Sequence, residues 1–387
     1  MHLKWAAAAA LAGAWLCGAA LAVAAPAPAL LDFSVAERAR IAAHGPWPQP
    51  ALSEPANRAQ GRAAAVAWGR ALFFDPRLSA SGRLSCASCH VPAQTFQDGR
   101  ATARSSPVAN PGHRNTPSLL DAAERRWLGW DGAHDSLWAA SLAPLLARDE
   151  MGRSAASLAA LARRDVRWRA AHRAAFGRAL PSDDEALLVD VAKVLAAYQA
   201  TLRSPRNAFD AFRDALVRGD LRAAARYPIA AQRGLRLFIG HGRCSVCHAG
   251  PAFSNGEFAD VGVPFFTRQG VDTGRHGGLQ QLQGSPMSRL GPYNDAGAGD
   301  PRAVTTRHVL IEPRHFGEFR VPGLRQLGRT SPYMHDGSLA TVEDVVRHYS
   351  QLNEERLHAD GQRILRRLDL SAGEAADLAA FLHSLSR

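Results

Sequence analysis

Apolar residues recur at helical spacing in several parts of the chain, whereas the alternation typical of strands is rare. Near the C-terminus, Ser371 and Glu374 form a capping-box pattern, which predicts the start of a helix. Its apolar face follows the spacing i, i+3, i+4, i+7 and consists of Ala375, Leu378, Ala379 and Leu382. A second helix is expected after Ser182, with an apolar face made of Leu188, Val191, Leu195, Tyr198 and Leu202. These patterns predict a mainly α-helical protein.

Two parts of the chain resemble each other. Residues 68–73 and 233–238 share the pattern G-x-x-L-F, which in both cases ends an apolar stretch ahead of a C-x-x-C-H motif. Such a repeat predicts two units of one architecture in tandem. The expected parts are a signal segment at residues 1–24, an N-terminal domain at residues 25–205 and a C-terminal domain at residues 206–387. From about residue 270 to residue 314 the chain is rich in Gly, Pro, Asp and Arg without periodicity, which predicts a long loop.

The C-x-x-C-H motif is the attachment site for c-type haem. Its cysteines form thioethers with the porphyrin, and its histidine ligates the iron. The two copies are Cys86, Cys89 and His90, and Cys244, Cys247 and His248. A zinc half-site is the alternative for a single copy, but two complete copies in a chain with only five cysteines disfavour it. We therefore predict two covalently bound haem c groups. The helical stretch before each motif resembles small cytochromes c, so each haem is expected at the centre of one cytochrome c-like domain.

The first residues have the features of a secretory signal. Lys4 precedes an Ala- and Leu-rich run, and residues 22–24 form an A-x-A cleavage site. A transmembrane anchor is the alternative, but the run is Ala-rich and ends at a cleavage site, so no stable membrane anchor is expected. Cys17 lies inside the run, so cleavage leaves only the four motif cysteines. Covalent haem attachment after export predicts a periplasmic protein.

The formal net charge is +11, and nearly all basic residues are arginines. No run of basic residues is interleaved with aromatic residues, so nucleic-acid binding is disfavoured. A basic surface can steer an acidic partner protein, although the arginines can equally reflect a compositional bias.

Further motifs resemble those of the bacterial dihaem cytochrome c peroxidase superfamily. The matching segments are residues 72–78 (LFFDPRL), 114–120 (RNTPSLL), 130–132 (WDG), 150–152 (EMG), 321–325 (VPGLR) and 332–337 (PYMHDG). They occur in the family's order and span nearly all of the chain after the signal segment. The resemblance implies that hydrogen peroxide is reduced at the N-terminal haem. It also implies that the C-terminal haem relays electrons from an external protein donor.

The resemblance further assigns the chain to the MauG-type branch. In ordinary peroxidases a methionine ligates the C-terminal iron fourteen residues after the histidine equivalent to His335, and here that position is Tyr349. A tyrosine axial ligand marks the MauG-type branch, and phenolate oxygen is a known haem ligand. The alternative is core packing, because Tyr349 continues an apolar helical face formed by Val342, Val345 and Val346. The neighbouring His348 should point away from that face.

At the N-terminal haem the resemblance implies a catalytic glutamate at Glu150, twenty residues after Trp130. The alternative for Glu150 is a surface acid. Pro144 matches a proline that lines the same pocket in the MauG-type branch, whereas Ala140 replaces a glutamine that the family places there. In ordinary peroxidases of the family, a histidine in the loop before the R-N-x-P segment blocks the sixth position of this iron. Here the only histidine in that loop is His113, directly next to Arg114 and closer to the motif than the family's histidine, so we expect a five-coordinate iron.

Two further roles are implied by the resemblance. Trp130 corresponds to a tryptophan near the inter-haem gap, where it either relays electrons or packs as core. Asn115, Thr330 and Pro332 match the protein ligands of a calcium ion held between the domains of relatives. Asn115 can instead cap a turn.

The leading hypothesis is a periplasmic dihaem peroxidase or oxidase that takes electrons from a small cytochrome c, a cupredoxin or a residue of a target protein. The alternative is a dihaem electron-transfer cytochrome without catalysis. That alternative requires a sixth ligand at the first haem, for which His113 and Met151 are the candidates.

Overall fold

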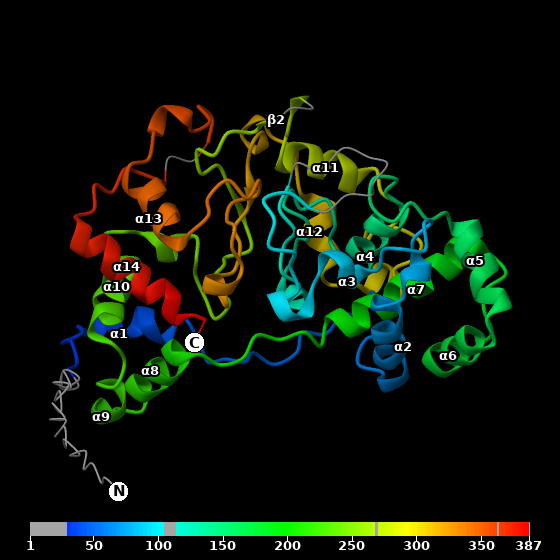
Figure 1. The fold of residues 1–387 in the computed structure, drawn as a ribbon, viewed down its shortest axis with the longest axis horizontal. Helices are drawn as coiled ribbons and strands as arrows, with labels where there is room; N and C mark the ends of the chain where they lie inside the picture. The colour runs from blue at the N-terminus through cyan, green and yellow to red at the C-terminus, as the bar shows by residue number, and fades with distance from the viewer. Residues whose placement is uncertain (1–28, 104–113, 268–269, 362–363, 387) are drawn as a thin grey trace, which may run out of the picture.

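The computed structural model describes residues 29–103, 114–267, 270–361 and 364–386. The expected signal segment at residues 1–24, and His113, lie outside these residues. Figure 1 shows two helical lobes joined by extended segments. Within the described ranges, no helix combines the length and the apolarity that are required to cross a bilayer.

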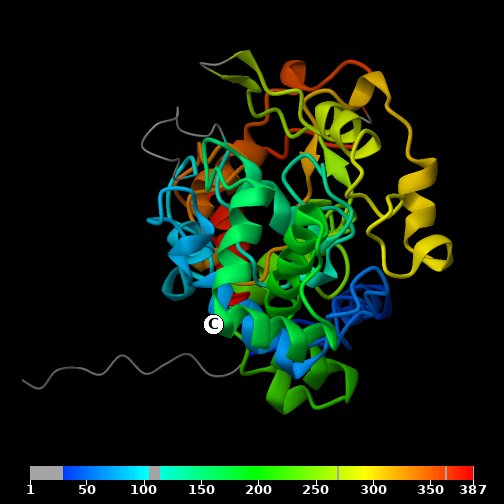
Figure 2. The same cartoon turned by 90° about the vertical axis from the view of Figure 1, so that its right-hand side faces the viewer.

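The first lobe, which faces the viewer in Figure 2, contains the first C-x-x-C-H motif. Its helices are α2 (Ala63–Phe73), α3 (Cys86–Cys89), α4 (Leu137–Leu146), α5 (Ala155–Arg164), α6 (Val166–Phe176) and α7 (Asp184–Gln199). The helix expected after Ser182 is α7, but Asp183 caps it by accepting a hydrogen bond from the backbone of Ala186.

The second lobe contains the second motif and is built in the same way. Its helices are α1 (Val35–Ala42), α8 (Ala208–Val217), α9 (Leu221–Ala224), α10 (Ile229–Ile239), α13 (Val342–Ser350) and α14 (Ala372–Ser384). Two short antiparallel ladders complete it, β1 (Phe258–Ala259) with β4 (Phe319–Arg320), and β2 (Phe266–Thr267) with β3 (Gly270–Val271). The expected capping box of Ser371 and Glu374 begins α14. The predicted mainly α-helical fold is confirmed.

The glycine of each G-x-x-L-F segment allows two helices to pack closely. In α2, a Cβ atom on Gly69 would collide with the carbonyl oxygen of Val194 in α7. In α10, a Cβ atom on Gly234 would collide with the carbonyl oxygen of Asp377 in α14. Each repeat therefore crosses one later helix backbone to backbone, and this contact holds the segment that leads into its C-x-x-C-H motif.

The two hydrophobic cores do not follow the order of the chain. Phe33 and Ile41 of the N-terminal segment are buried in the core of the second lobe, against residues such as Phe212. The expected N-terminal domain at residues 25–205 therefore requires a correction, because α1 packs on the second lobe. The segment can reach this core since residues 45–62 run between the lobes without helix.

The expected loop between about residues 270 and 314 also requires a correction. It contains two helices, α11 (Arg275–Gln283) and α12 (Ala303–His308). Its irregular part is tied to the first lobe, where buried Lys193 of α7 lies 2.7 Å from Asp295 and donates to the carbonyl of Tyr293 at 2.8 Å. Buried Arg289 pairs with Asp300 at 2.7 Å within the same segment. This segment is held by ion pairs rather than by a periodic apolar face, so the pattern of apolar residues did not reveal its contacts.

Candidate haem sites

The histidines of the two motifs have the same hydrogen-bonding arrangement. Nδ1 of His90 lies 3.0 Å from the carbonyl oxygen of Phe96, and Nδ1 of His248 lies 3.0 Å from that of Phe253. A carbonyl only accepts, so Nδ1 carries the proton and Nε2 keeps its lone pair. This is how proteins orient a histidine that ligates a metal through Nε2.

Both carbonyls come from residues in the left-handed region. The φ angle is 59° at Phe96 and 55° at Phe253, which is uncommon for bulky side chains. Such conformations concentrate at functional sites, where surrounding packing maintains them. The carbonyls of Pro117 and Pro322 also interact with His90 and His248, respectively. Motif analysis did not identify these four residues as partners, although both prolines occur in the R-N-T-P and V-P-G segments.

Burial sets the protonation of the motif side chains. It lowers the pKa of His90 and of His248, which keeps both imidazoles neutral and able to ligate iron. Burial also raises the pKa of Cys86 and of Cys244 to about 12, so both are protonated thiols. No disulfide joins cysteines in the described part of the chain. These properties fit thioether attachment of a haem.

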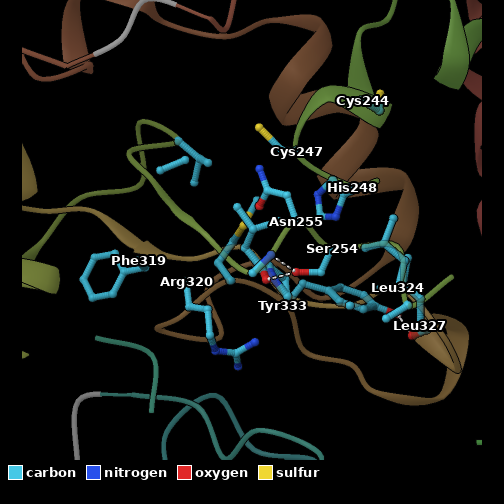
Figure 3. Close-up of a pocket in the computed structure, with 18 of the residues that line it drawn as sticks. Cys244, Cys247, His248, Ser254, Asn255, Phe319, Arg320, Leu324, Leu327 and Tyr333 are labelled. Carbon is cyan, nitrogen blue, oxygen red and sulfur yellow. Dashed lines mark hydrogen bonds between the residues drawn. The ribbon is translucent and has the colours of Figure 1, made fainter. Parts of the chain in front are cut away.

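A cavity of about 870 Å³ adjoins the second motif, with Cys244, Cys247 and His248 in its wall. Figure 3 shows these residues together with Phe319 and Arg320, which extend the wall towards the first lobe. Pockets for cofactors typically measure roughly 300–1,000 Å³, so the cavity is large enough for a haem.

Tyr349 on α13 lines the same cavity as His248. Burial raises the pKa of its phenol, and the nearby thiols of Cys244 and Cys247 raise it further. Tyr349 therefore lies beside the haem-attachment cysteines, although it also follows Val345 and Val346 along the expected helical face. The His348 ring lies 2.8 Å from the carbonyl oxygen of Val261, and His348 does not itself line the cavity.

Glu150 lies in the turn that follows α4. Its side chain is accessible, yet the protein around its carboxyl raises its pKa, and the neighbouring Asp149 adds to the shift. Burial is the main cause of the raised pKa of Cys86, and interactions with Cys89 and Glu150 raise it further, which indicates that the Glu150 carboxyl lies near the first motif. An acid with a raised pKa beside a redox centre can exchange protons nearer neutral pH than an ordinary glutamate.

Pro144 and Ala140 lie one helical turn apart on α4, and both are partly buried. Ala140 packs against the core of the first lobe. Met151 is buried in that core and therefore packs as an apolar side chain. Ala140 cannot replace the hydrogen-bonding amide of the family's glutamine, because its side chain ends at Cβ.

The space between the motifs brings together Trp130 and the residues matched to calcium ligands. Trp130 donates from Nε1 to the carbonyl of Asn115 at 2.8 Å. Asn115, Thr330 and Pro332 line the large cavity together with Trp130. Asn115 donates from its side chain to the carbonyl of Arg100 at 2.6 Å, so its amide joins two segments as well as facing the cavity. The described residues contain no cluster of three or more His, Cys, Asp or Glu side chains suited to a metal.

Two arginines of the recognised segments hold the lobes in place. Arg114 forms ion pairs with Asp131 and Asp272, both at 2.6 Å. Buried Arg325 pairs with buried Asp210 at 2.8 Å and covers the ring of Trp47 at 3.9 Å. The sequence placed both arginines in motifs, but Asp272 lies 158 residues from Arg114 and Asp210 lies 115 residues from Arg325.

Two C-x-x-C-H motifs with oriented, neutral histidines define a c-type dihaem protein. The family model for di-haem cytochrome c peroxidase matches residues 63–218. The methylamine utilization protein MauG of Methylorubrum extorquens is 34% identical over 320 residues, which cover 83% of this chain and 77% of that protein. The cytochrome-c peroxidase IdrP1 of Denitromonas iodatirespirans is 33% identical over 343 residues, which cover 88% and 85%.

A similar solved structure is that of a MauG-like protein associated with microbial copper homeostasis. It has a TM-score of 0.64 and 27% identity, and the match covers 88% of this chain and 95% of that chain. The chain belongs to the dihaem cytochrome c peroxidase family that includes MauG. The predictions of two tandem cytochrome c-like domains, of two covalently bound haem c groups and of a peroxidase-type oxidoreductase are thereby confirmed.

Proposed function

We propose that this protein is a periplasmic peroxidase of the MauG-type branch. It reduces hydrogen peroxide at the haem on His90, with electrons that arrive through the haem on His248 from an external protein. The bound haems supply the redox chemistry that no side chain provides. The observation that carries the proposal is the difference between the sites, since a carboxyl accompanies Cys86 and a phenol accompanies His248.

Glu150 is the proton-transfer group in this proposal. With the haems bound, Glu150 would accept a proton from one oxygen of hydrogen peroxide and return it to the other. That second oxygen would leave as water as the O–O bond breaks, with the two electrons supplied by the haems. The raised pKa of Glu150 favours both transfers, because a carboxyl whose pKa is nearer to the working pH both accepts and releases a proton more readily than an ordinary glutamate. Pro144 and Ala140 present no hydrogen-bond donor from their side chains, so proton transfer rests on Glu150.

Tyr349 is the proposed ligand opposite His248. Its phenol is neutral in the protein environment, because burial disfavours the phenolate. A bound ferric haem would compensate for that cost, because its positive charge favours the anionic oxygen as a ligand. Trp130 lines the cavity at the second motif and would provide an aromatic step for electrons that pass between the haems.

The external donor is a small cytochrome c, a cupredoxin or a protein substrate. Support comes from the surface at the second motif, where Val246 between the two cysteines is 47% exposed and Arg243 beside it is also exposed. An apolar residue with adjacent positive charge suits a partner that carries an acidic rim. Electron transfer from such a partner should slow as ionic strength rises.

Electron paramagnetic resonance of the purified protein tests the proposal. We expect one high-spin ferric haem at His90, open to peroxide, and one low-spin haem at His248. Two low-spin signals that persist after addition of peroxide would instead support the electron-carrier alternative. Burial of Met151 in the first core disfavours that alternative in advance.

A calcium ion at Asn115, Thr330 and Pro332 is part of the proposal. Amide and carbonyl oxygens are suitable ligands for calcium. Removal of calcium with a chelator should change the spin state or potential of the haems, and added calcium should restore it. Magnesium serves as the control, since it demands a smaller octahedral site.

A further inference from the structure

Two arginines in the wall of the large cavity have no carboxylate partner. Arg320 is 5% exposed, and the hydrogen bond formed by its guanidinium goes to the carbonyl of Gly129 at 3.1 Å. Arg125 donates from one nitrogen to the carbonyls of Ser118 and Leu120, both at 2.9 Å. Among the described residues, neither guanidinium has an acidic oxygen within ion-pair distance.

This arrangement differs from that of other buried arginines in the same protein. Arg325 and Arg289 are each paired with buried aspartates, Asp210 and Asp300. A buried cation without an anion is costly, because transfer from water is compensated only by a counter-charge. Arg320 and Arg125 also repel each other, and burial together with Arg125 lowers the pKa of Arg320 to about 9. Asp131 and Asp121 attract Arg320 and Arg125, respectively, only from beyond ion-pair distance. The two guanidinium groups are therefore free to bind an anion from outside the polypeptide.

The cavity indicates which anion is suitable. Arg320 and Arg125 line it together with His248, Cys244 and Cys247, which are the attachment residues of the second haem. A haem carries two propionate carboxylates, and planar guanidinium groups bind carboxylates through paired hydrogen bonds. Figure 3 shows the Arg320 side chain on the side of the cavity away from the cysteines. Propionates lie on the porphyrin edge opposite the vinyl groups that the cysteines bind.

We propose that Arg320 and Arg125 form a carboxylate-binding subsite for the propionates of the haem on His248. The subsite neutralises buried Arg320 and half-buried Arg125 and, at the same time, fixes the second haem towards the first lobe. The guanidinium of Arg320 lies 5.8 Å from the ring centroid of Trp130, so the subsite also adjoins the proposed path between the haems. Positive charge next to the propionates favours the reduced haem and so raises its potential.

Substitution in the full-length holoprotein tests the subsite. Arg320→Gln should lower the midpoint potential of the His248 haem and change the propionate bending band in resonance Raman spectra. Arg125→Gln should act in the same direction at the His248 haem. Because the charge of Arg125 also acts on His90, only the change in Arg320→Gln should exceed that at the His90 haem. The matched control is Arg126→Gln, since Arg126 lines the same cavity but is 56% exposed and pairs with Glu257. The control should leave potential and Raman band unchanged.

An equal response of Arg320→Gln and Arg126→Gln would overturn the proposal. Haem content measured by the pyridine haemochrome assay separates a change of potential from loss of haem. Where Arg320→Gln binds too little haem, Arg320→Lys retains the charge and should restore both haem content and the wild-type Raman band. A lysine variant that loses haem equally would show that packing, rather than charge, requires Arg320, and would overturn the proposal.

Discussion

The two haem sites have the same arrangement around the motif histidine and differ in the other groups that lie near it. In both, a histidine donates from Nδ1 to the carbonyl of a phenylalanine with positive φ. The first site then has Glu150, an accessible acid in a turn. The second has Tyr349, a phenol on the buried face of a helix. Under the proposed function the same repeat supports two tasks, because the histidine side of each site holds the cofactor and the other groups set its reactivity.

The locations of Glu150 and Tyr349 suit the roles proposed for them. A turn leaves the Glu150 carboxyl accessible to a small substrate and to water, which proton transfer requires. A helix holds Tyr349 rigidly beside the motif cysteines and restricts water, which suits electron storage. The predictions below separate these two roles, from the largest expected effect to the smallest.

Glu150→Gln should slow the reaction with peroxide by about 10²–10⁴-fold, the usual contribution of one proton-transfer group. The substitution preserves shape, so the spectra of both haems should be unchanged. Rapid mixing with hydrogen peroxide gives the rate. Asp149→Asn is the matched control, and its rate at neutral pH should stay within a few-fold of the wild type. An unaltered rate for Glu150→Gln would remove this residue from the mechanism.

Tyr349→Met should raise the potential of the His248 haem by on the order of 0.1–0.3 V, a part of the ~0.8 V range that axial ligands produce. A thioether favours ferrous iron, whereas an anionic oxygen favours ferric iron. Spectroelectrochemical titration measures both haems at once, and the His90 haem serves as the internal reference. His348→Gln is the neighbouring control. If Tyr349→Met leaves the potential as it was, Tyr349 serves only in packing.

Gly69→Ala and Gly234→Ala should each destabilise one lobe by about 1–3 kcal/mol or more, the usual cost of overpacking. The added methyl group meets a carbonyl of α7 in the first case and of α14 in the second. Gly373→Ala in α14 is the control, because nothing lies near its Cβ position and alanine favours helix by about 1 kcal/mol. Thermal unfolding followed at each haem's absorbance should show which lobe is weakened.

The rate of reaction with peroxide should depend on pH through Glu150. The protein around its carboxyl raises the pKa of Glu150 above that of an ordinary glutamate, and Asp149 raises it further. The carboxyl accepts a proton only when it is ionised, so the rate should fall as pH falls through this raised pKa. In Asp149→Asn the repulsion is absent, so the fall should move to lower pH. A pH–rate profile that Glu150→Gln does not alter would contradict this assignment.

Local patterns were sufficient for the parts of the site that a few consecutive residues form. Each C-x-x-C-H motif contains its own attachment chemistry, and apolar spacing located α7, α13 and α14. The same reasoning failed for α1, since nothing in its amphipathic pattern specifies which core it joins. It also failed for α11 and α12, where glycines and charged residues obscure the helical period.

The sequence by itself determined that the protein carries two covalent haems on a repeated helical unit, because motif and periodicity are properties of neighbouring residues. Only the tertiary structure decided which distant groups meet at those haems. Phe96 and Phe253 became partners of the histidines through their backbone conformation, which side-chain patterns do not record. Arg320 and Arg125 converge from segments almost two hundred residues apart, and their shared lack of a carboxylate exists only in three dimensions. Burial gives both features their energetic weight, because hydrogen bonds are stronger and unpaired charges are more costly where water is excluded.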